Sequence, residues 1–565
     1  MTRYILFFFT LLTSLICVGQ SNSNILLVQN FDSNNKKIEN ISSQGVTTVG
    51  EGNNKVAFFD GVDDFMSFQV PHLNTNNDFS ISLWVAPLRY KQAASWISKP
   101  NNGNSKSQFR FGFGWPANKN LNFAFYDNFW QDETLEHALP LNQWTHLVYT
   151  LSPKNKKGQL YINGKIEHEY ELKKYMPSKD SVFLGLQWDD YIFYHGYMDE
   201  VIFFNEVISE TEIKKIFKTF TKTKKVNIKS KVATTKKEYV YTIPKKRNDK
   251  IIVGDIRTKI CNFDSIFSVV ENQLNDNNAS LESLLIYKGD QLVLEEYFHG
   301  HTLNSLHGLS SVTKSFTSTL LGISIDKGFI KNEDTRLSYH YRYESENTPC
   351  IDSITLKHVL NHKSGIFPID IDEKFRTQKE WIPQIVSSQT ECKIGVFNYN
   401  ELNPEIIIHT VFRNSDIQGL NFVNKYLFEP LDIKNYYWLK DQTGTIDGGT
   451  GLVMIPRDML KFGILYKDKG MFDHKRVLSE EWVKKATDKN ITDFKYNYFW
   501  WRFNESIEEK SIYGYSARGF GGQTITIVSE LDLIIVTTNS PTGSEIGVNE
   551  IVRKFIIPAF VKIEK

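Results

Sequence analysis

Short segments in which apolar and polar residues alternate fill the chain from Asn24 to about Ile216. Between Ser80 and Val85, the apolar residues occupy every second position, which is the period of a strand with one face in the core. Leu160-Tyr161-Ile162 runs into Asn163-Gly164, the strongest short signal for a hairpin. Aromatic residues are dense in this part and helical periodicity is almost absent. The pattern predicts an all-β sandwich over residues 24–218.

A different pattern extends from residue 251 to 565. Two apolar runs, Leu284 to Tyr287 and Leu292 to Phe298, meet at the turn sequence Lys288-Gly289-Asp290-Gln291. Helical stretches fill the middle, and the apolar runs Thr524 to Val528 and Leu533 to Thr538 come near the end. Strands at both ends around a helical middle predict an α+β domain, in which one antiparallel sheet is flanked by helices.

The two parts are separated by a basic segment. Lys222 to Lys237 holds seven lysines and no acidic residue, and Pro244 follows. Such a charge run is usually solvated, so we expect a linker over residues 219–250. Attraction to an anionic polysaccharide or a lipid surface is the alternative.

The first residues have the pattern of a secretory signal. Arg3 precedes the apolar run Ile5 to Val18, and small residues stand just before Gln20, so residues 1–19 are expected to be removed as a signal peptide. The run of 14 residues is too short to span a membrane comfortably, and lipid attachment at Cys17 is the alternative. We expect a secreted or periplasmic protein without a transmembrane segment.

Charge and cysteine content narrow the classes of partner. The 565 residues include 66 basic and 65 acidic side chains, so net charge gives no reason to expect nucleic acid as a partner. Cleavage before Gln20 would leave Cys261, Cys350 and Cys392, whose odd number and spacing fit no metal site. We expect free thiols, with a Cys350–Cys392 bridge as the alternative in an oxidising compartment.

Ser311-Val312-Thr313-Lys314 is the strongest candidate for chemistry. The segment opens an apolar helical pattern that ends near Gly328, and residues three apart share one face of a helix. Lys314 can therefore bring its amine to the Ser311 hydroxyl. To act as a base near pH 7, a lysine needs its pKa lowered by roughly 3 units. A buried site with a second titrating group could supply that shift.

Two later segments supply what this pair needs. Tyr399, in Phe397-Asn398-Tyr399-Asn400, can share a proton with Lys314 so that the two titrate jointly. The glycine-rich segment Ala517 to Gln523 leads into a strand, and glycines there let a substrate carbonyl approach the backbone. The Gln523 N–H can join the Ser311 N–H in an oxyanion hole.

The amino-acid sequence of residues 24–218 resembles that of the laminin-G-like, or concanavalin-like, jelly-roll domains. The resemblance rests on Phe59 to Asp64, Phe79 to Val85, Gln143 to Val148, Leu160 to Lys165 and Gly196 to Val201, in that order, followed by a closing turn at Ser209 to Ile213. It implies a domain that binds a glycan or a protein and, in some members, calcium. Asp60 and Asp199 are the acids expected to hold calcium. The alternative is that both acids cap turns and the sandwich is a spacer.

The second part resembles the class C β-lactamase-related serine hydrolases. The resemblance rests on successive segments: Ser311 to Phe316, Ile354 to Ile366, Phe397 to Asn400, Gly449 to Leu452 with Pro456 to Met459, and Ala517 to Gln523. Within that superfamily the segments most resemble esterases and 6-aminohexanoate-oligomer amidases. The resemblance implies Ser311 as nucleophile, Lys314 and Tyr399 as the proton-transfer pair, and an acyl-enzyme intermediate. No metal or other cofactor is required.

Several neighbouring residues have secondary assignments. Gly521, Gly522, Arg518 and Trp501 are expected to contact the substrate. The Lys363-Ser364-Gly365 segment precedes Tyr399 and is interpreted as structural. His307 and His362 are expected to be satisfied hydrogen-bonding residues.

Two departures from the family pattern affect the expected substrate. The third place of the tyrosine segment is Glu401, where the family has Asn or Ser, so either Asn403 takes over that role or the enzyme is impaired. The strand place that holds Lys-Thr/Ser-Gly in true β-lactamases reads Phe520-Gly521-Gly522. The missing lysine favours a small ester, an amide or an acylated polymer over a β-lactam. A glycan-binding protein with an inactive hydrolase domain and a penicillin-interactive peptidase are the alternatives.

Overall fold

The computed structural model describes most of the chain, and the ranges are as follows: 25–29, 31, 41–51, 54–100, 107–114, 119–126, 130–172, 175, 177–187, 191–223, 238–276, 279–341, 350–366, 381–387, 393–440, 444–490, 495–540 and 547–562. The predicted signal peptide, Cys17, most of the lysine-rich run and Cys392 lie outside these residues. Cys261 and Cys350 are free thiols. None of the helices in the described ranges has the length and apolar composition needed to cross a membrane.

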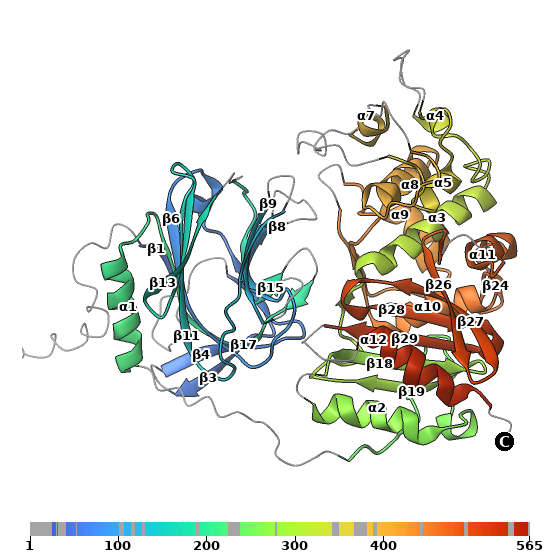
Figure 1. Cartoon of the computed structure of the whole chain (residues 1–565), viewed down its shortest axis with the longest axis horizontal. Coiled ribbons are helices and arrows are strands. Elements are labelled where there is room, and N and C mark those ends of the chain that lie inside the picture. The colour runs from blue at the N-terminus through green and yellow to red at the C-terminus, as the bar shows by residue number, and fades with distance from the viewer. Residues whose placement is uncertain are drawn as a thin grey trace, which may run out of the picture.

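Two antiparallel sheets form the N-terminal domain, which we call the sandwich domain (Figure 1). The first sheet contains, in spatial order, β13 (Lys165–Glu171), β12 (Lys157–Ile162), β11 (Thr145–Ser152), β6 (Phe79–Pro87), β17 (His195–Phe204), β4 (Asn54–Asp60) and β3 (Thr47–Glu51), and β1 (Ile25–Gln29) pairs with β17. The second contains β10 (Trp130–Leu135), β9 (Leu121–Tyr126), β8 (Ser107–Phe113), β7 (Ser95–Pro100), β14 (Val182–Leu184), β5 (Phe65–Phe68) and β2 (Ser42–Gln44). The predicted all-β sandwich is confirmed.

Aromatic side chains fill the space between these sheets. Phe111 of β8 stacks on Tyr149 of β11 with ring centroids 4.2 Å apart, and the Trp96 indole N–H donates to the Tyr149 hydroxyl at 3.2 Å. The predicted hairpin joins β12 to β13, where Asn163 and Gly164 both have positive φ. Positive φ at both positions is the geometry that an Asn-Gly turn favours.

The outer face of β6 is also buried, which differs from the alternating pattern of its sequence. Helix α1 (Glu210–Thr223) lies on the outer side of the first sheet (Figure 1). Trp84 stacks on His146 of β11 and on Phe217 of this helix. Ser209 caps the helix by accepting the Glu212 N–H at 3.3 Å. The segment expected to form a closing turn therefore begins a helix that runs past residue 218.

A seven-stranded antiparallel sheet forms the centre of the C-terminal domain. Its order is β19 (Gln291–Tyr297), β18 (Leu281–Lys288), β29 (Leu533–Asn539), β28 (Thr524–Val528), β27 (Lys510–Arg518), β26 (Trp500–Ile507) and β25 (Tyr496–Asn497). The strands predicted at both ends of this part are thus neighbours, because β18 pairs directly with β29. The predicted antiparallel sheet with flanking helices is confirmed.

Helices cover both faces of this sheet. The α3 (Thr313–Asp326) and α10 (Pro456–Lys467) helices share one apolar cluster with Leu285 and Tyr287 of β18. The α2 (Phe263–Asn275), η7 (Ile551–Ile556) and η8 (Ile557–Phe560) helices share another with Leu284 and Ile286. Alternate residues of one strand point to opposite faces, so the strand divides its apolar residues between two layers of helices. The face covered by α3 carries the candidate site.

The remaining elements are short connections and a helical region that stands above the sheet in Figure 1. The helices are η1 (Pro71–Asn74), η2 (Ile256–Thr258), η3 (Ser310–Val312), α4 (Leu337–His340), α5 (Leu356–Leu360), α7 (Trp381–Ser387), α8 (Leu402–Arg413), α9 (Leu420–Val423), η4 (Asn424–Phe428), α11 (Glu480–Thr487), η5 (Phe520–Gly522), η6 (Ser529–Leu531) and α12 (Val548–Glu550). The strands are β15 (Leu186–Gln187), β16 (Ile192–Phe193), β20 (His307–Gly308), β21 (Tyr436–Trp438), β22 (Leu452–Met454), β23 (Met471–Phe472) and β24 (Lys475–Arg476).

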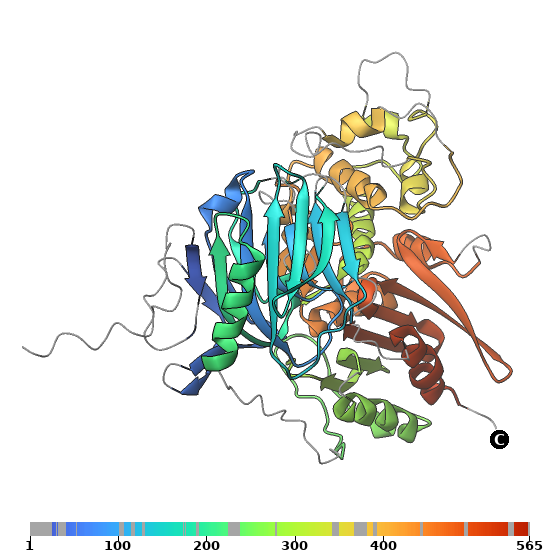
Figure 2. The same cartoon turned by 60° about the vertical axis from the view of Figure 1, so that its left-hand side comes forward.

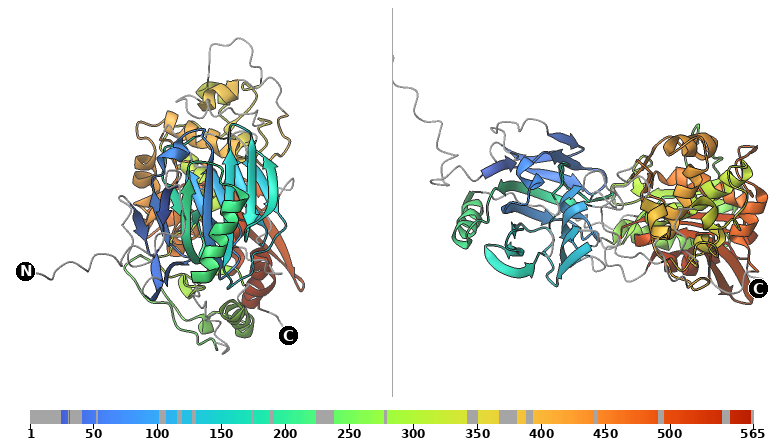
Figure 3. Two further views of the ribbon diagram at one scale, coloured as in Figure 1. Left: turned by 90° about the vertical axis from the view of Figure 1, so that its left-hand side faces the viewer. Right: turned by 90° about the horizontal axis from the view of Figure 1, so that it is seen from above.

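Packing of the C-terminal domain begins before residue 251. The Tyr239 hydroxyl donates to Glu296 at 2.6 Å, the Tyr241 hydroxyl donates to the Val293 carbonyl at 2.9 Å, and Arg457 donates to the Lys245 carbonyl at 2.8 Å. Residues near the end of the predicted linker are therefore held against β19 and α10. The two domains lie side by side (Figures 2 and 3).

Candidate active site

Ser311 lies in η3, at the point where the chain enters α3, as its sequence predicts. The residue before it, Ser310, has a φ of 46°, a left-handed conformation that a non-glycine residue adopts at a cost of about 1–3 kcal/mol. Such strain persists only where the surrounding structure imposes it, and here the Leu309 amide is fixed by the Leu452 carbonyl at 2.8 Å. Ser311 is partly exposed while the next residues of α3 are buried. The hydroxyl is thus accessible at a rigid helix entrance.

Lys314 is fully buried and directs its ammonium group at the serine. Its Nζ donates to the Ser311 Oγ at 2.8 Å, to the Glu401 Oε2 and Oε1 at 2.7 and 3.0 Å, and to the Gly449 carbonyl at 3.1 Å. An ammonium group carries three hydrogens, so these acceptors share them. The predicted contact between the serine and the lysine is present, with Glu401 as an additional partner.

Glu401 is brought to Lys314 by the start of α8. The Asn400 side chain caps this helix by accepting the amides of Leu402 and Asn403, both at 3.1 Å. Opposite the carboxylate stands Gly449, where an added Cβ would lie 2.3 Å from the Glu401 Oε2. Only a glycine leaves room for the carboxylate in this position.

Glu401 also determines the charge of the lysine. Burial disfavours the ammonium form, but the Glu401 carboxylate and Tyr399 outweigh burial and raise the pKa of Lys314 above its ordinary value. A lysine needs a lowered pKa to act as a base near pH 7. In this site the pKa of Lys314 is raised instead. Lys314 is therefore a cation in the resting enzyme, paired with Glu401.

Tyr399 stands beside this pair in an aromatic surround. The Lys314 Nζ lies 5.0 Å from the centroid of the Tyr399 ring, and hydrogen bonding with Tyr399 contributes to the raised pKa of Lys314. The tyrosine ring packs on His362 with centroids 4.5 Å apart and on Trp501 at 6.0 Å. The structure thus brings together the serine, the lysine, the tyrosine and the partly exposed Trp501 that were predicted as neighbours.

Asn403 does not take the place of the missing neutral residue. Its side chain accepts the Ser364 hydroxyl at 2.7 Å and lies 3.1 Å from the His362 Nδ1. Burial and the charge of Lys314 hold the pKa of His362 well below its usual range, so this histidine is neutral. Ser364 is a hydrogen-bonded part of the frame, as predicted, whereas His362 is satisfied only at Nδ1, because its buried Nε2 has no hydrogen-bond partner among the described residues.

The glycine-rich segment forms a tight turn against the serine. Gly521 and Gly522 have φ values of 82° and 105°, and a Cβ at Gly519 would lie 2.2 Å from the Leu309 carbonyl oxygen. The Gln523 side chain is held by β29, where it donates to the Asn539 carbonyl at 2.6 Å and accepts the Asn539 amide at 3.1 Å. The side-chain amide is therefore engaged with β29, and the oxyanion role of the Gln523 N–H stays a prediction.

Arg518 is not brought to the site. Ala517 belongs to the apolar cluster on the α3 side of the sheet, and its neighbour on the strand points to the opposite face. The Arg518 guanidinium lies 5.7 Å from the centroid of the Phe503 ring, which belongs to the cluster on the α2 side. Burial lowers the pKa of Arg518 to about 10. Its predicted role as a substrate contact has no geometric support.

The acids expected to hold calcium do not form one group. The Asp60 carboxylate accepts the Val62 amide at 2.7 Å and lies together with Asp63 and Asp64. Asp199 is buried within β17 and accepts the Glu200 amide at 2.9 Å; it is not part of the Asp60 group. The Asp60, Asp63 and Asp64 carboxylates have the spacing of a candidate metal site, so calcium at Asp60 stays a prediction.

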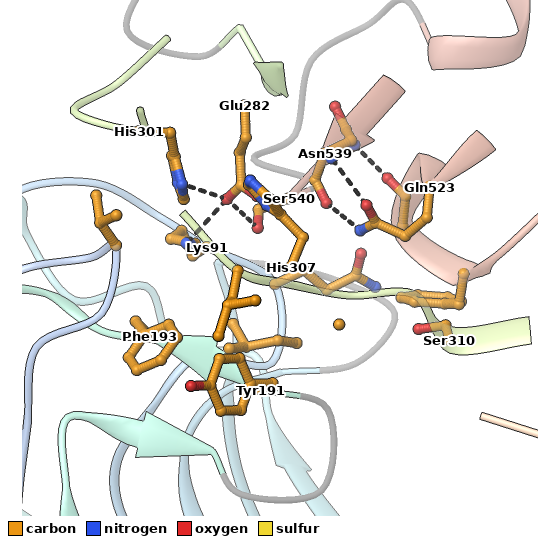
Figure 4. Close-up of a pocket in the computed structure, with 17 residues that line it drawn as sticks. Lys91, Tyr191, Phe193, Glu282, His301, His307, Ser310, Gln523, Asn539 and Ser540 are labelled. Carbon is orange, nitrogen blue, oxygen red and sulfur yellow. Dashed lines mark hydrogen bonds and ion pairs between the residues drawn. The ribbon is translucent and has the colours of Figure 1, made fainter. Parts of the chain in front are cut away.

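A buried charge cluster joins the two domains beyond this site, and the sequence did not indicate it (Figure 4). Glu282 of β18 contacts the Lys91 Nζ at 3.0 Å, the His301 Nε2 at 3.1 Å and the His307 Nδ1 at 2.9 Å, and accepts the Ser540 hydroxyl at 2.6 Å. Burial lowers the pKa of His301 to about 4, so this imidazole is neutral near pH 7. The only hint in the sequence is the spacing of His301 and His307, which lie six residues apart and supply the histidines of this cluster.

Comparisons with known proteins identify both domains. Residues 60–214 match the family described as the concanavalin A-like lectin/glucanases superfamily, and residues 278–553 match the family described as beta-lactamase. A 6-aminohexanoate-dimer hydrolase of Paenarthrobacter ureafaciens is 23% identical over 288 residues, which cover 46% of this chain and 72% of that protein. An uncharacterized protein of Alkalihalophilus pseudofirmus is 23% identical over 325 residues, covering 52% and 94%.

Solved structures resemble each half separately. A 6-aminohexanoate-dimer hydrolase-like protein of Bacillus anthracis has 20% identity and a TM-score of 0.42 over 50% of this chain and 80% of that one. The fourth domain of an extracellular arabinanase from Geobacillus stearothermophilus has 18% identity and a TM-score of 0.29 over 34% and 97%. The chain thus joins a sandwich domain that matches the concanavalin A-like lectin/glucanases superfamily to a C-terminal domain that matches the beta-lactamase family.

Proposed function

We propose that this chain is an exported serine hydrolase that cleaves an ester or an amide through an acyl-enzyme on Ser311. The observation that carries the proposal is the contact of 2.8 Å between the Lys314 Nζ and the Ser311 Oγ, at a partly exposed serine that begins a helix. A charged lysine in this position stabilises negative charge on the serine oxygen as it attacks.

In the acylation step the Ser311 Oγ attacks the substrate carbonyl carbon. The serine proton passes to the Lys314–Tyr399 pair once that pair has lost a proton to solvent. The backbone N–H groups of Ser311 and Gln523 receive the carbonyl oxygen as it becomes negative. The carbon–oxygen or carbon–nitrogen bond then breaks, and the leaving alcohol or amine takes the proton back.

Deacylation repeats the sequence with water in place of the serine. Water attacks the ester carbon, gives its proton to the same pair, and the released Ser311 oxygen recovers one. Serine, lysine and tyrosine supply both the nucleophile and the proton transfer, so the proposed chemistry calls for no metal.

The substrate class is proposed from the site and from similarity. Similarity to a 6-aminohexanoate-dimer hydrolase favours short amides beside simple esters. The segment Phe520-Gly521-Gly522 carries no cation for a β-lactam carboxylate, and Arg518 lies on the other face of the sheet. We propose that the sandwich domain recognises a glycan or another surface polymer, which would raise the local concentration of acylated substrate.

Turnover of p-nitrophenyl esters of several acyl lengths tests the proposal. The wild type should release p-nitrophenol with an initial burst, and Ser311→Ala should abolish both the burst and the turnover. The matched control is Ser310→Ala, which removes the neighbouring hydroxyl and leaves the nucleophile. Equal activity of Ser311→Ala and wild type would remove Ser311 as nucleophile.

A second candidate function rests on the raised pKa of Lys314. A lysine held as a cation by Glu401 is a poor base, which favours a glycan-binding protein whose hydrolase domain is inactive. This candidate predicts no ester turnover between pH 6 and 10 together with glycan binding. A penicillin-interactive peptidase, in contrast, would form a covalent adduct with a fluorescent penicillin.

A further inference from the structure

The sandwich domain is fixed to the C-terminal domain next to the candidate active site. Lys91, in the loop between β6 and β7, is buried and donates to the Gly61 carbonyl at 2.8 Å as well as contacting Glu282 at 3.0 Å. The buried Arg89 donates to the Ala279 carbonyl, and a Cβ at Gly300 would lie 3.3 Å from the Val62 side chain. Two segments of the sandwich domain, around Val62 and at Arg89–Lys91, therefore meet two segments of the C-terminal domain.

A narrow cavity lies between the domains and ends at the glycine-rich turn of the site (Figure 4). On the C-terminal side it is lined by Ser310, which precedes the nucleophile, and by Gly521 and Gln523. On the opposite side it is lined by the segment Tyr191–Phe193 of the sandwich domain. Ser310, the residue before the nucleophile, lines one end of the cavity, Ser311 itself is not among the lining residues, and the other end reaches the Glu282 cluster.

The Tyr191–Phe193 segment is a firm wall. Phe193 is 2% exposed, pairs with Leu186 in the β15–β16 hairpin, and packs against the Tyr191 ring with centroids 5.0 Å apart. Tyr191 has a φ of 56°, a left-handed conformation that is typical of a tight turn. The cavity volume of about 30 Å³ leaves room for about two water molecules.

We propose that the Tyr191–Phe193 segment of the sandwich domain is a wall of the substrate-binding site and limits the size of the substituent accepted beside the Gly521–Gln523 turn. The proposal rests on the proposed hydrolase function and deepens it, because it assigns specificity to the other domain. A substrate carbonyl placed between Ser311 and the Gln523 N–H must direct one of its substituents past this turn, and the wall stands across the cavity from it. The enzyme should therefore favour short substituents at this position.

The Tyr191→Gly variant removes the wall with little risk to folding. Glycine adopts positive φ without the cost that tyrosine carries, so the turn should be retained. The ratio of kcat/KM for p-nitrophenyl octanoate to that for p-nitrophenyl acetate should rise about tenfold or more, since single methylene groups in enclosed pockets change specificity by factors of this size. Tyr191→Trp should lower the same ratio.

Two further variants make the test specific. Phe217→Ala removes an aromatic side chain from α1, on the side of the sandwich away from the C-terminal domain (Figure 1), and should leave the ratio at the wild-type value. Lys91→Met combined with Glu282→Gln removes the ion pair between the domains and should raise the ratio as Tyr191→Gly does, because the wall is then no longer held in place.

The outcomes separate the wall from the reaction. A wild type that turns over acetate and a ratio within twofold of wild type in Tyr191→Gly and in the double variant would overturn the wall and leave the hydrolase function standing. No turnover of any ester by the wild type, together with no labelling of Ser311 by a fluorophosphonate, would overturn the hydrolase function and the wall with it. A rise of the ratio in Phe217→Ala equal to that in Tyr191→Gly would also contradict the proposal.

Discussion

The Glu401 carboxylate contacts the Lys314 ammonium with both oxygens, at 2.7 and 3.0 Å. The lysine is buried and the glutamate is half exposed, so one end of the ion pair is closed to water and the other is open. This arrangement joins the nucleophile to a surface charge through a single side chain. The pH at which the serine becomes reactive should therefore depend on Glu401.

Replacing Glu401 with the family's residue should move activity to lower pH. The carboxylate contributes most to raising the pKa of Lys314 against the effect of burial, so in Glu401→Asn only Tyr399 still opposes burial and the pKa falls. Neutral lysine is the basic form, and kcat/KM rises with pH through this pKa. Each unit by which the rise moves to lower pH should increase kcat/KM at pH 7 about tenfold. The pH profile of ester hydrolysis measures the shift.

Two results bear on that interpretation. Glu401→Asp keeps the negative charge. The pKa of Lys314 should therefore stay raised, although less than in the wild type, and the pH profile should lie between those of the wild type and Glu401→Asn. A profile for Glu401→Asn that moves to higher pH, or an inactive Glu401→Asn enzyme with wild-type stability, would mean that the carboxylate itself accepts the proton.

Gly449→Ala should disturb the site through Glu401 alone. The new methyl group would lie 2.3 Å from the Glu401 Oε2, so the carboxylate must leave its position. The half-exposed Glu401 side chain can move away, so the cost in unfolding free energy should come from its lost contact with the buried Lys314 ammonium. In the Glu401→Ala background the same methyl group has space, so the cost should fall. A double-mutant cycle with chemical denaturation measures the coupling, and additive effects would contradict it.

Tyr399→Phe should lower activity while the protein remains folded. The ring contacts with His362 and Trp501 do not need the hydroxyl, whereas the proposed proton transfer with Lys314 does. Loss of a positioned acid–base group typically reduces the rate about 10²–10⁴-fold. Measurement of kcat/KM together with the thermal midpoint separates the two effects. Activity within threefold of wild type would exclude the tyrosine from proton transfer.

Glu282→Gln should destabilise the protein in a manner that depends on pH. Burial opposes the charge of Glu282, but His301 and Lys91 outweigh it and hold its pKa well below the usual range. A carboxyl group with a lowered folded pKa stabilises the fold above its unfolded pKa of about 4.3, and this contribution disappears as the pH falls through the folded pKa. Removing one partner of a buried ion pair costs about 3–5 kcal/mol.

Denaturation of wild type and Glu282→Gln at pH 7 and at successively lower pH checks this expectation. The difference in unfolding free energy should stay constant above pH 5 and shrink below about pH 4. Lys91→Met combined with Glu282→Gln should be less destabilised at pH 7 than Glu282→Gln alone, because no unpaired cation remains buried. A difference that grows as the pH falls would contradict the assigned ion pair.

Local patterns were sufficient to predict most of the fold. The β18–β19 hairpin follows from two apolar runs joined by Gly289-Asp290, both of which adopt positive φ. The burial of the outer face of β6 was less predictable. Ser82 on this face bonds to His146 at 2.8 Å, and both lie under α1, which comes more than 100 residues after β6 in the chain. Burial of polar positions by a distant element leaves no local signal.

The candidate site was predictable in its members and not in its electrostatics. Ser311, Lys314 and Tyr399 meet as their order in the chain indicates, yet the sequence does not reveal that Glu401 at the start of α8 pairs with the lysine. The face of Arg518 could have been deduced, since Ala517 is an apolar core position and strand neighbours alternate. The Lys91–Glu282 pair joins residues from two domains, and no spacing in the sequence records such a contact.

Mass spectrometry of the fluorophosphonate-treated protein tests the central claim most directly. After proteolysis we expect one modified peptide, with the adduct on Ser311. The labelling rate of the wild type should rise with pH, and in Glu401→Asn the same rise should occur at a lower pH. Lys314→Met should be labelled at least about 100-fold more slowly, since it lacks the group that activates the serine. Failure to find an adduct on Ser311 at any pH, in a protein that still hydrolyses esters, would contradict the account.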